Sequence, residues 1–327
     1  MIYSEGETMT KEMVEADDLW HSPTSDHPHW TETSYWGFYV PERRLSGTIY
    51  NMWRKNLGLV ASRVWLWDDD GDLPVDALYT KAAEHVTIPD GADPTNFELP
   101  TGLSCERIAP LESHRFRYTD GDVVTFELVT DALRPPTAAF GGEAPGTGHF
   151  DQHIRVTGSI RLWGEELAVD CFSMRDRTWS MRSDYLDLNL LNGYMHATLS
   201  ADDCWLAMSS SSPPDTNEQA IAEGAGCLVI DGKEATIVGG HRRVTHRRRG
   251  RPERLEVHLR DSLGRTLEVE GEALNHLGAL LNPAIFNWFS LYRWTYPDGR
   301  VAFGEDQETW IPPTEFRRAL NAERDGR

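Results

Sequence analysis

The sequence lacks the short motifs that identify the commonest enzyme classes. Its 327 residues contain no Gly-x-Gly-x-x-Gly, P-loop, Gly-x-Ser-x-Gly or His-Glu-x-x-His pattern. The dinucleotide, nucleotide, serine-hydrolase and zincin classes therefore lose their main support. The four cysteines are scattered and include no Cys-x-x-Cys pair, so neither a cysteine metal site nor a disulfide framework is indicated. We expect neither a metal nor an organic cofactor.

Long apolar runs and a positive charge balance are also missing. No run approaches the ~20 residues that a membrane span needs, and residues 1–18 lack the basic start and apolar centre of a signal peptide. The formal net charge is −20, which argues against non-specific binding to nucleic acid or to an anionic membrane. The sequence predicts a cytoplasmic protein with no nucleic-acid partner and no stable membrane insertion. A homodimer is left open.

Aromatic residues, by contrast, are plentiful, with 12 Trp, 10 Tyr and 11 Phe. Trp and Tyr combine a large apolar body with a polar end. They either fill large β-barrel cores or line a cavity for a flat or apolar ligand. The composition leaves both interpretations open.

Short alternating segments of β-forming residues recur along the chain. An Asp-Gly pair between two such segments is the strongest short-range hairpin signal. It occurs at residues 70–71, 120–121, 231–232 and 298–299. This pattern predicts an antiparallel all-β protein, a sandwich or a barrel. A few short helices are expected at 75–83, 272–281 and 314–322.

The predicted strands divide into two similar sets, before and after residues 175–182. Closing each set on itself is the natural way to remove exposed sheet edges. We therefore expect one barrel over residues 26–182 and a second over 183–327, ending in a short helix. Residues 1–25 are charged and mostly non-periodic, and we expect a flexible arm there.

The densest group of charges is Arg175-Asp-Arg-Thr-Trp-Ser-Met-Arg182, at the end of a predicted strand. Asp176 is either an ion-paired anchor with a lowered pKa or a proton donor in an apolar cavity with a raised pKa. Trp179 is either a core residue or a ring stacked on a ligand. The residues alone do not decide between these roles.

A second group begins at His149, in the segment His-Phe-Asp-Gln-His-Ile-Arg. On a strand, Asp151 and His153 would share one face and Gln152 would lie on the other. Histidine is the side chain best able to move protons near neutral pH. The alternatives are a solvated entrance to the strand and a weakly supported metal site.

A third group surrounds Glu32 in Trp30-Thr-Glu-Thr-Ser-Tyr-Trp36. Alternation would place Glu32 and Trp36 on one face and Tyr35 on the other. A glutamate buried among aromatic rings has a raised pKa suited to general acid catalysis. Alternatively, Glu32 pairs with an arginine at the start of a strand.

Two further segments carry charge in the C-terminal half. Residues 241–254 are arginine-rich and predict either a solvated hairpin that pairs with acidic residues or a nucleic-acid site. The net charge of −20 argues against the second interpretation. Glu305, on a predicted last strand, is a candidate to line the second barrel.

Together these motifs resemble the carotenoid 1,2-hydratase/AttH-like family. The resemblance rests on His149-Phe-Asp-Gln, on Arg175–Arg182, on the Trp-x-Glu-x-x-Tyr start at Trp30 and on the close from Asp298 to Glu305. It implies two packed lipocalin-like barrels that enclose an apolar substrate without a metal or an organic cofactor. The family's Asp-His-(Glu/Ser)-Trp motif matches residues 176–179, where an arginine replaces the histidine and cannot shuttle protons.

We therefore predict a cofactor-independent enzyme that acts on a terpenoid, polyene, steroid-like or polyketide-like small molecule. The reaction would be a hydration, cyclisation or isomerisation by acid-type catalysis. The alternative is a non-catalytic lipocalin-like carrier of an apolar ligand. The predicted catalytic residues are Asp176, Glu32 and Arg177. The predicted substrate-binding residues are Trp179, Arg175, Tyr35, Trp36, His149, Gln152 and Glu305.

Overall fold

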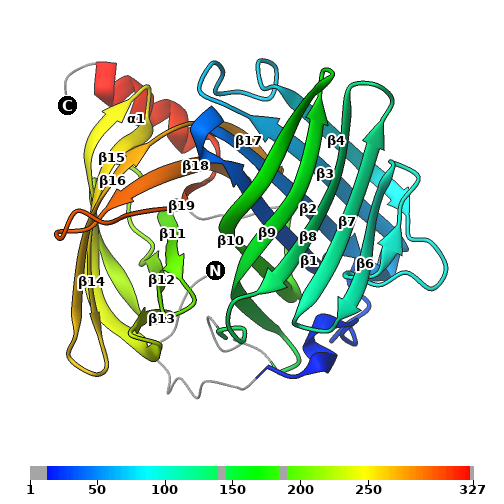
Figure 1. Cartoon of the computed structure of the whole chain (residues 1–327), viewed down its shortest axis with the longest axis horizontal. Coiled ribbons are helices and arrows are strands. Elements are labelled where there is room, and N and C mark those ends of the chain that lie inside the picture. The colour runs from blue at the N-terminus through cyan, green and yellow to red at the C-terminus, as the bar shows by residue number, and fades with distance from the viewer. Residues whose placement is uncertain (1–12, 139–144, 185–189, 325–327) are drawn as a thin grey trace. The chain divides into compact units, whose positions relative to one another are not determined.

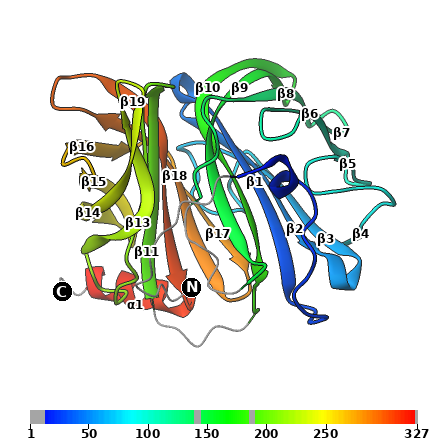
Figure 2. The same cartoon turned by 90° about the horizontal axis from the view of Figure 1, so that it is seen from below.

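The computed structural model describes residues 13–138, 145–184 and 190–324. The chain divides into two compact units, each an antiparallel β-sheet (Figures 1 and 2). Unit 1 runs to Leu66 and resumes at Leu78–Arg182, whereas unit 2 comprises Trp67–Ala77 and the chain from Ser183 onward. In the described part of the chain, no helix is both long and apolar enough to span a membrane.

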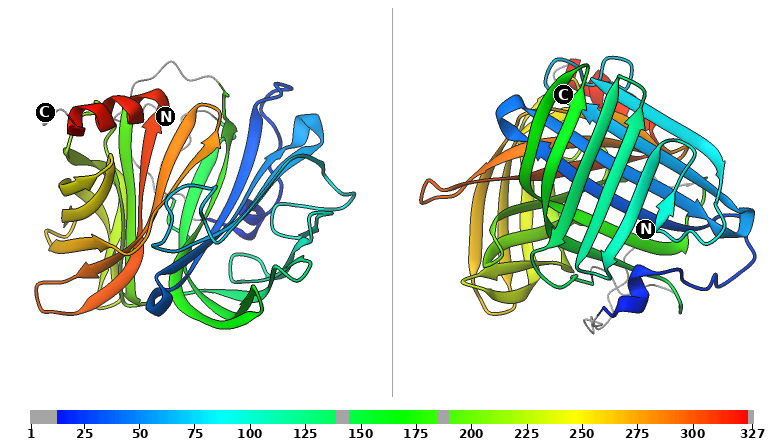
Figure 3. Two further views of the ribbon diagram at one scale, coloured as in Figure 1. Left: turned by 90° about the horizontal axis from the view of Figure 1, so that it is seen from above. Right: turned by 45° about the vertical axis from the view of Figure 1, so that its right-hand side comes forward.

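Unit 1 is one curled sheet of ten strands in the order β4-β3-β2-β1-β10-β9-β8-β7-β6-β5. Its strands are β1 (Trp30–Val40), β2 (Leu45–Arg54), β3 (Leu59–Trp67), β4 (Tyr79–Thr87), β5 (Phe97–Glu98), β6 (Leu103–Ala109), β7 (Ser113–Asp120), β8 (Val124–Ala132), β9 (Gly148–Leu162) and β10 (Glu165–Met181). Short 3-10 turns occupy Glu15–Asp18, Pro41–Arg43 and Lys55–Leu57. The view with unit 1 turned forward shows β6–β9 in front of β1–β4 (Figure 3).

The curl gives the sheet an interior face and an outer face. On the interior face, rings from distant strands meet: the centroids of Trp36 and Phe116 are 4.7 Å apart, and those of Trp53 and Phe97 are 5.1 Å apart. The outer face carries exposed polar residues such as Asp170, which pairs with Arg155. Because successive side chains of a strand point to opposite faces, each strand contributes to both.

Side chains link the edge strand β4 to β7, the third strand from the other edge of the unit 1 sheet. The hydroxyl of Tyr79 on β4 hydrogen-bonds to the hydroxyl of Tyr118 on β7 and donates to Asp120 Oδ2 at 2.6 Å. Lys81 Nζ contacts the same carboxylate at 3.1 Å. This contact covers part of the edge that an open sheet would leave unprotected.

Unit 2 is a sheet of nine strands in the order β16-β15-β14-β13-β12-β11-β19-β18-β17. Its strands are β11 (Leu190–Ser200), β12 (Asp203–Ser209), β13 (Glu218–Ile230), β14 (Lys233–Arg248), β15 (Arg251–Asp261), β16 (Thr266–Ala273), β17 (Leu277–Asn282), β18 (Ile285–Thr295) and β19 (Val301–Ile311). An additional pairing of β16 with β18 closes the sheet into a barrel, and β17 stays outside the closure. These two units confirm the predicted all-β architecture.

One of the three predicted helices is present. Helix α1 (Thr314–Arg324) covers the predicted segment 314–322. The helices predicted at 75–83 and 272–281 are wrong, because β4 begins within the first and β17 within the second. Both segments contain Ala and Leu, which favour helix, but pairing with a neighbouring strand overrides that weak local preference.

Candidate functional site

Strand alternation separates the predicted site residues of unit 1 into two groups. Arg175 lies opposite Gln152 on β9 and Trp36 on β1, and Arg177 lies opposite Ser34, so these side chains share the interior face. Asp176, between the two arginines, points to the outer face. The interior group comprises Glu32, Trp36, Gln152, Arg175, Arg177 and Trp179. The outer group comprises Tyr35, His149 and Asp176.

Asp18 is the counter-ion of Arg175. The Nη1 atom of Arg175 lies 2.9 Å from Asp18 Oδ1, and its Nε donates to Gln152 Oε1 at 2.7 Å. Asp18 Oδ2 is 3.1 Å from His114 Nε2 and accepts the Leu111 amide at 2.9 Å. Burial opposes ionisation of Asp18, but Arg175 and His114 hold its pKa well below the usual value. This carboxylate stays charged.

The second interior ion pair joins Arg177 to Glu32, the arginine pairing that the sequence left open. Arg177 Nη2 donates to Glu32 Oε2 at 2.8 Å, and both side chains are fully buried. Glu32 also accepts the backbone N–H of His21 at 2.9 Å, and the His21 ring is stacked on Trp179 with centroids 3.8 Å apart. Trp179 lies over Gly148, where an added Cβ would be 2.4 Å from the indole.

Sequence reasoning missed Asp18 and His21 because residues 1–25 were assigned to a flexible arm. Residues 1–12 lie outside the described part, but within the remainder Asp18 is fully buried. Two arginines on one face of a buried strand need counter-ions. That requirement could have signalled a missing carboxylate, although it does not say which one.

The outer face carries a row of four ionisable side chains across neighbouring strands. Tyr50 on β2 is opposite Tyr35, Tyr35 is opposite Asp176, and Asp176 is opposite Asp151 on β9. Side chains directly opposite each other are in contact range. Burial, with a smaller contribution from the neighbouring Asp151, raises the pKa of the partly exposed Asp176 to about 6.

His149 lies beside this row and links two other polar groups. Its Nε2 is 3.0 Å from Asp151 Oδ2, and its Nδ1 is 2.7 Å from Thr178 Oγ1. Burial alone would lower the pKa of His149, but Asp151 and Asp176 raise it. A carboxyl with a pKa of about 6 and an imidazole with a raised pKa therefore stand together, which is an arrangement that can donate and accept protons. We call Tyr50, Tyr35, Asp176, Asp151 and His149 the outer-face cluster.

Glu305 belongs to unit 2. It is fully buried on β19 and accepts a hydrogen bond from Gln307 Nε2 at 2.6 Å. On the same strand, Asp306 binds Arg242 through both oxygens at 2.8 Å. Arg242 in turn donates to Gln219, directly opposite on β13, so unit 2 repeats the Arg–Gln pairing of unit 1.

The arginine-rich hairpin of residues 241–254 pairs with carboxylates of this chain. Arg243 binds Glu256, Arg247 binds Glu308, and Arg251 binds Asp72. These contacts match the predicted hairpin that pairs with acidic residues of its own chain.

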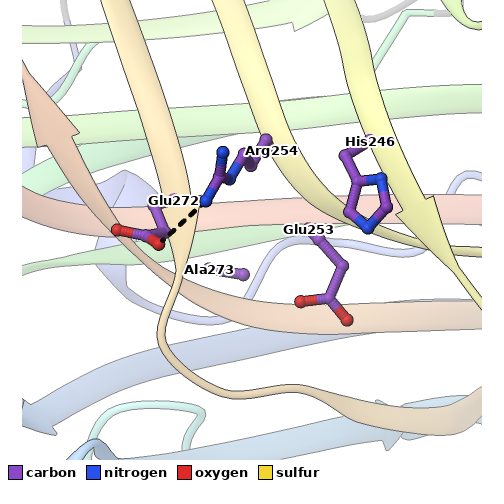
Figure 4. A pocket seen from close by; sticks show the side chains of 5 residues that line it. All are labelled: His246, Glu253, Arg254, Glu272 and Ala273. Atoms are coloured by element: carbon purple, nitrogen blue, oxygen red, sulfur yellow. Dashed lines mark ion pairs between the residues drawn. The ribbon is translucent and has the colours of Figure 1, made fainter.

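A pocket of about 350 Å³ lies in unit 2 (Figure 4). It is lined by His246, Glu253, Arg254, Glu272 and Ala273. The one ion pair drawn there joins Arg254 to Glu272 at 3.7 Å. None of these residues was predicted to belong to the site. We place the candidate site at the outer-face cluster instead, because its Asp176 has a pKa raised to about 6 and lies beside an imidazole whose pKa is also raised.

Comparison with known proteins identifies a matching family. A family model described as "Domain of unknown function (DUF7064)" matches residues 14–310. A search of curated proteins found no match. Among the described residues, no group of three or more His, Cys, Asp or Glu side chains is arranged to hold a metal ion.

Two solved structures have the same fold. An AttH-like protein from Nitrosomonas europaea has a TM-score of 0.59 at 16% identity, covering 86% of this chain and 92% of that protein. Kievitone hydratase from Nectria haematococca has a TM-score of 0.54 at 12% identity, covering 96% and 97%. At these identities the likeness shows the fold alone.

Proposed function

The chain belongs to the DUF7064 family, and we propose that it is a hydratase-like enzyme that adds water to a small hydrophobic molecule. The observation that carries the proposal is the outer-face cluster, where a carboxyl with a pKa of about 6 stands beside His149. Kievitone hydratase, which shares the fold, supports this class of reaction. The substrate class that we propose is a terpenoid, polyene, steroid-like or polyketide-like molecule with a carbon–carbon double bond.

In the proposed mechanism, protonated Asp176 is the acid and His149 is the base. Asp176 gives its proton to one carbon of the double bond, and a water molecule bonds to the other carbon, where positive charge develops. His149 takes a proton from that water, and Asp151 stabilises the resulting imidazolium. Transfer of this proton from His149 back to Asp176 restores the starting state, and the net change is the addition of one water. Tyr35 contributes an aromatic wall that favours the developing cation.

Arg177 and Glu32 have a positioning role in this proposal, and so do Arg175, Gln152 and Trp179. Their side chains lie on the interior face of the sheet, whereas the outer-face cluster lies on the opposite face. The ion pairs of Arg175 and Arg177 hold β10 from inside on either side of Asp176. We propose that this fixes the direction of the Asp176 carboxyl.

The test compares Asp176→Asn with Asp170→Asn, a matched control on the same strand and face. Each purified variant is incubated with kievitone and with a panel of polyenes and terpenoids. Mass spectrometry then detects products heavier by one water. We expect Asp176→Asn to lower turnover by about 10²–10⁴-fold, the usual contribution of a general acid, and Asp170→Asn to leave it unchanged.

Two outcomes contradict this proposal in different ways. Unchanged turnover by Asp176→Asn removes that carboxyl from the mechanism. If the wild type binds panel members with saturation but converts none, the protein is instead a carrier of apolar ligands.

A further inference from the structure

The pocket in unit 2 is lined mostly by charged and titratable side chains (Figure 4). Of its five lining residues, Ala273 alone brings an apolar side chain. The volume of about 350 Å³ lies within the range of about 300–1,000 Å³ that is typical of small-molecule sites. An apolar ligand does not suit this lining, because ionised groups would lose water without gaining partners. The pocket therefore calls for a polar ligand.

An irregularity in the pairing of β14 with β15 brings two consecutive residues to this pocket. His246 is opposite Arg254, and the next pair is Arg247 with Pro252. Glu253 lies between these pairs without an opposite residue, as the extra residue of a β-bulge. In a regular strand Glu253 and Arg254 would point to opposite faces, but a bulge changes the direction of a side chain. The bulge thus explains how both line one pocket.

The positively charged side of the lining is only weakly paired. Arg254 is 3.7 Å from Glu272, and its side chain is 66% exposed. Glu272 is bound more closely by Arg293, at 2.7 Å. Among the described residues, the His246 imidazole has no hydrogen-bond or ion-pair partner. Arg254 and His246 are therefore available to an acidic group of a ligand.

The negatively charged side of the lining also has a vacant position. Glu253 Oε1 accepts a hydrogen bond from Arg251 Nε at 2.9 Å and lies 3.7 Å from His276 Nε2. Its other oxygen, Oε2, has no such partner within the described part of the chain. His276 and Arg251 outweigh the effect of burial and lower the pKa of Glu253 to about 2. This carboxylate is ionised at neutral pH and can accept an N–H donor.

The two signs of charge decide what kind of ligand fits. A simple anion would meet the carboxylates of Glu253 and Glu272, and a simple cation would meet Arg254. A molecule that carries one charge of each sign pairs with both sides of the lining. We propose that this pocket binds a small zwitterion of the amino-acid class, with its carboxylate on Arg254 and its ammonium group on Glu253. No residue of the outer-face cluster takes part, so this inference does not rest on the proposed hydratase function.

Three probes of similar size test the ligand class on the full-length protein. L-Glutamine is the zwitterion, glutaramate is the same molecule without its α-amine, and 4-aminobutanamide is the same molecule without its carboxylate. Calorimetric and saturation-transfer NMR titrations give the affinity for each. L-Glutamine should saturate at one equivalent and bind at least about tenfold more tightly than either analogue.

Three outcomes of these titrations overturn the proposal. Equal or tighter binding of glutaramate makes the pocket an anion site, and equal or tighter binding of 4-aminobutanamide makes it a cation site. If L-glutamine does not bind with saturation, the lining groups are met by water alone.

Two variants assign the two ends of the ligand. Arg254→Gln should weaken binding of L-glutamine by about tenfold or more and leave binding of 4-aminobutanamide unchanged, because that probe has no carboxylate. Glu253→Gln should weaken binding of L-glutamine to a similar extent and leave binding of glutaramate unchanged. Arg260→Gln, at an exposed arginine of the same strand, is the control and should change none of the three affinities. Equal weakening of both analogues by Arg254→Gln contradicts the assigned contact.

A third variant guards against a loss of folding. Glu253 also binds Arg251, so the midpoint of thermal unfolding is measured for each variant. If Glu253→Gln does not fold, His246→Ala removes a side chain that has no partner to lose among the described residues. It should keep the midpoint and weaken binding of L-glutamine by about fivefold. Unchanged binding in both Arg254→Gln and His246→Ala places the ligand elsewhere and overturns the proposal. These readouts are independent of turnover, so failure of the hydratase proposal leaves them interpretable.

Discussion

Replacing Asp176 with asparagine should make the protein more stable at neutral pH, and the gain should vanish in acid. Burial raises the pKa of this carboxyl from 3.8 to about 6 in the folded protein. The folded state therefore holds the proton more tightly than the unfolded chain, so stability falls as pH rises between those values and stays low above them. Two pKa units correspond to about 3 kcal/mol. Solvent reaches part of the side chain and screens its charge, so we expect a gain of about 1–3 kcal/mol.

Urea unfolding followed by tryptophan fluorescence measures this effect, at about pH 4.5 and about pH 7.5. Asp176→Asn should unfold at a clearly higher urea concentration than the wild type at the higher pH and at nearly the same one at the lower pH. Asp170→Asn is the control, because Arg155 lowers the pKa of this exposed carboxylate and its removal brings no gain. A stability difference for Asp176→Asn that is the same at both pH values refutes the reasoning.

The same site gives a further prediction for catalysis, and the interior gives one for folding. The rate should follow a bell-shaped pH profile, because the reactive form carries a proton on Asp176 and none on His149. The pKa of Asp176 is about 6 and that of His149 is raised above its usual 6.5, so this form is the minor one of the two singly protonated states. The two macroscopic pKa values belong to the pair, and a rate that keeps rising above the upper one would exclude Asp176 as the acid. Asp18→Asn should destabilise the protein by about 3–5 kcal/mol at neutral pH, because it leaves Arg175 buried without its counter-ion. The pKa of Asp18 is lower in the folded protein than in the unfolded chain, so this loss of stability should shrink as pH falls below the ordinary value of 3.8. A loss of stability that does not change with pH would contradict the ion-pair account.

Two local sequence patterns, the Asp-Gly pairs and the alternation of side chains, predicted much of the fold. The Asp-Gly pairs at 231–232 and 298–299 lie in the connection between two paired antiparallel strands, and the pair at 120–121 begins at the last residue of β7. The period of two also fixes which side chains share a face. The two helix predictions failed where local preference and strand pairing disagreed. In each case the segment pairs with the adjacent strand of the chain, β4 with β3 and β17 with β18, and helix propensity takes no account of such a partner.

The site was less accessible to sequence reasoning. Alternation already implied that Asp176 and its flanking arginines face opposite ways, although proximity in the sequence suggested one cluster. The partner of Arg175 is 157 residues away, at Asp18. No local rule identifies such a contact, because it depends on how the sheet curls and on where the chain before β1 returns to it.

The segment Trp67–Ala77 bears on how this protein is made and how it can be cut. It lies between two strands of unit 1, yet it belongs to unit 2, where Trp67 Nε1 donates to Asn275 Oδ1 at 3.0 Å. During synthesis this segment leaves the ribosome long before the strands that it packs with. The Trp67 indole therefore cannot form its hydrogen bond to Asn275 until those strands have been made. A gene divided between residues 182 and 183 would leave a piece of the second unit on the first product. Neither product would then be a complete folding unit. To express the two units separately, residues 67–77 would have to be joined to the product that carries unit 2.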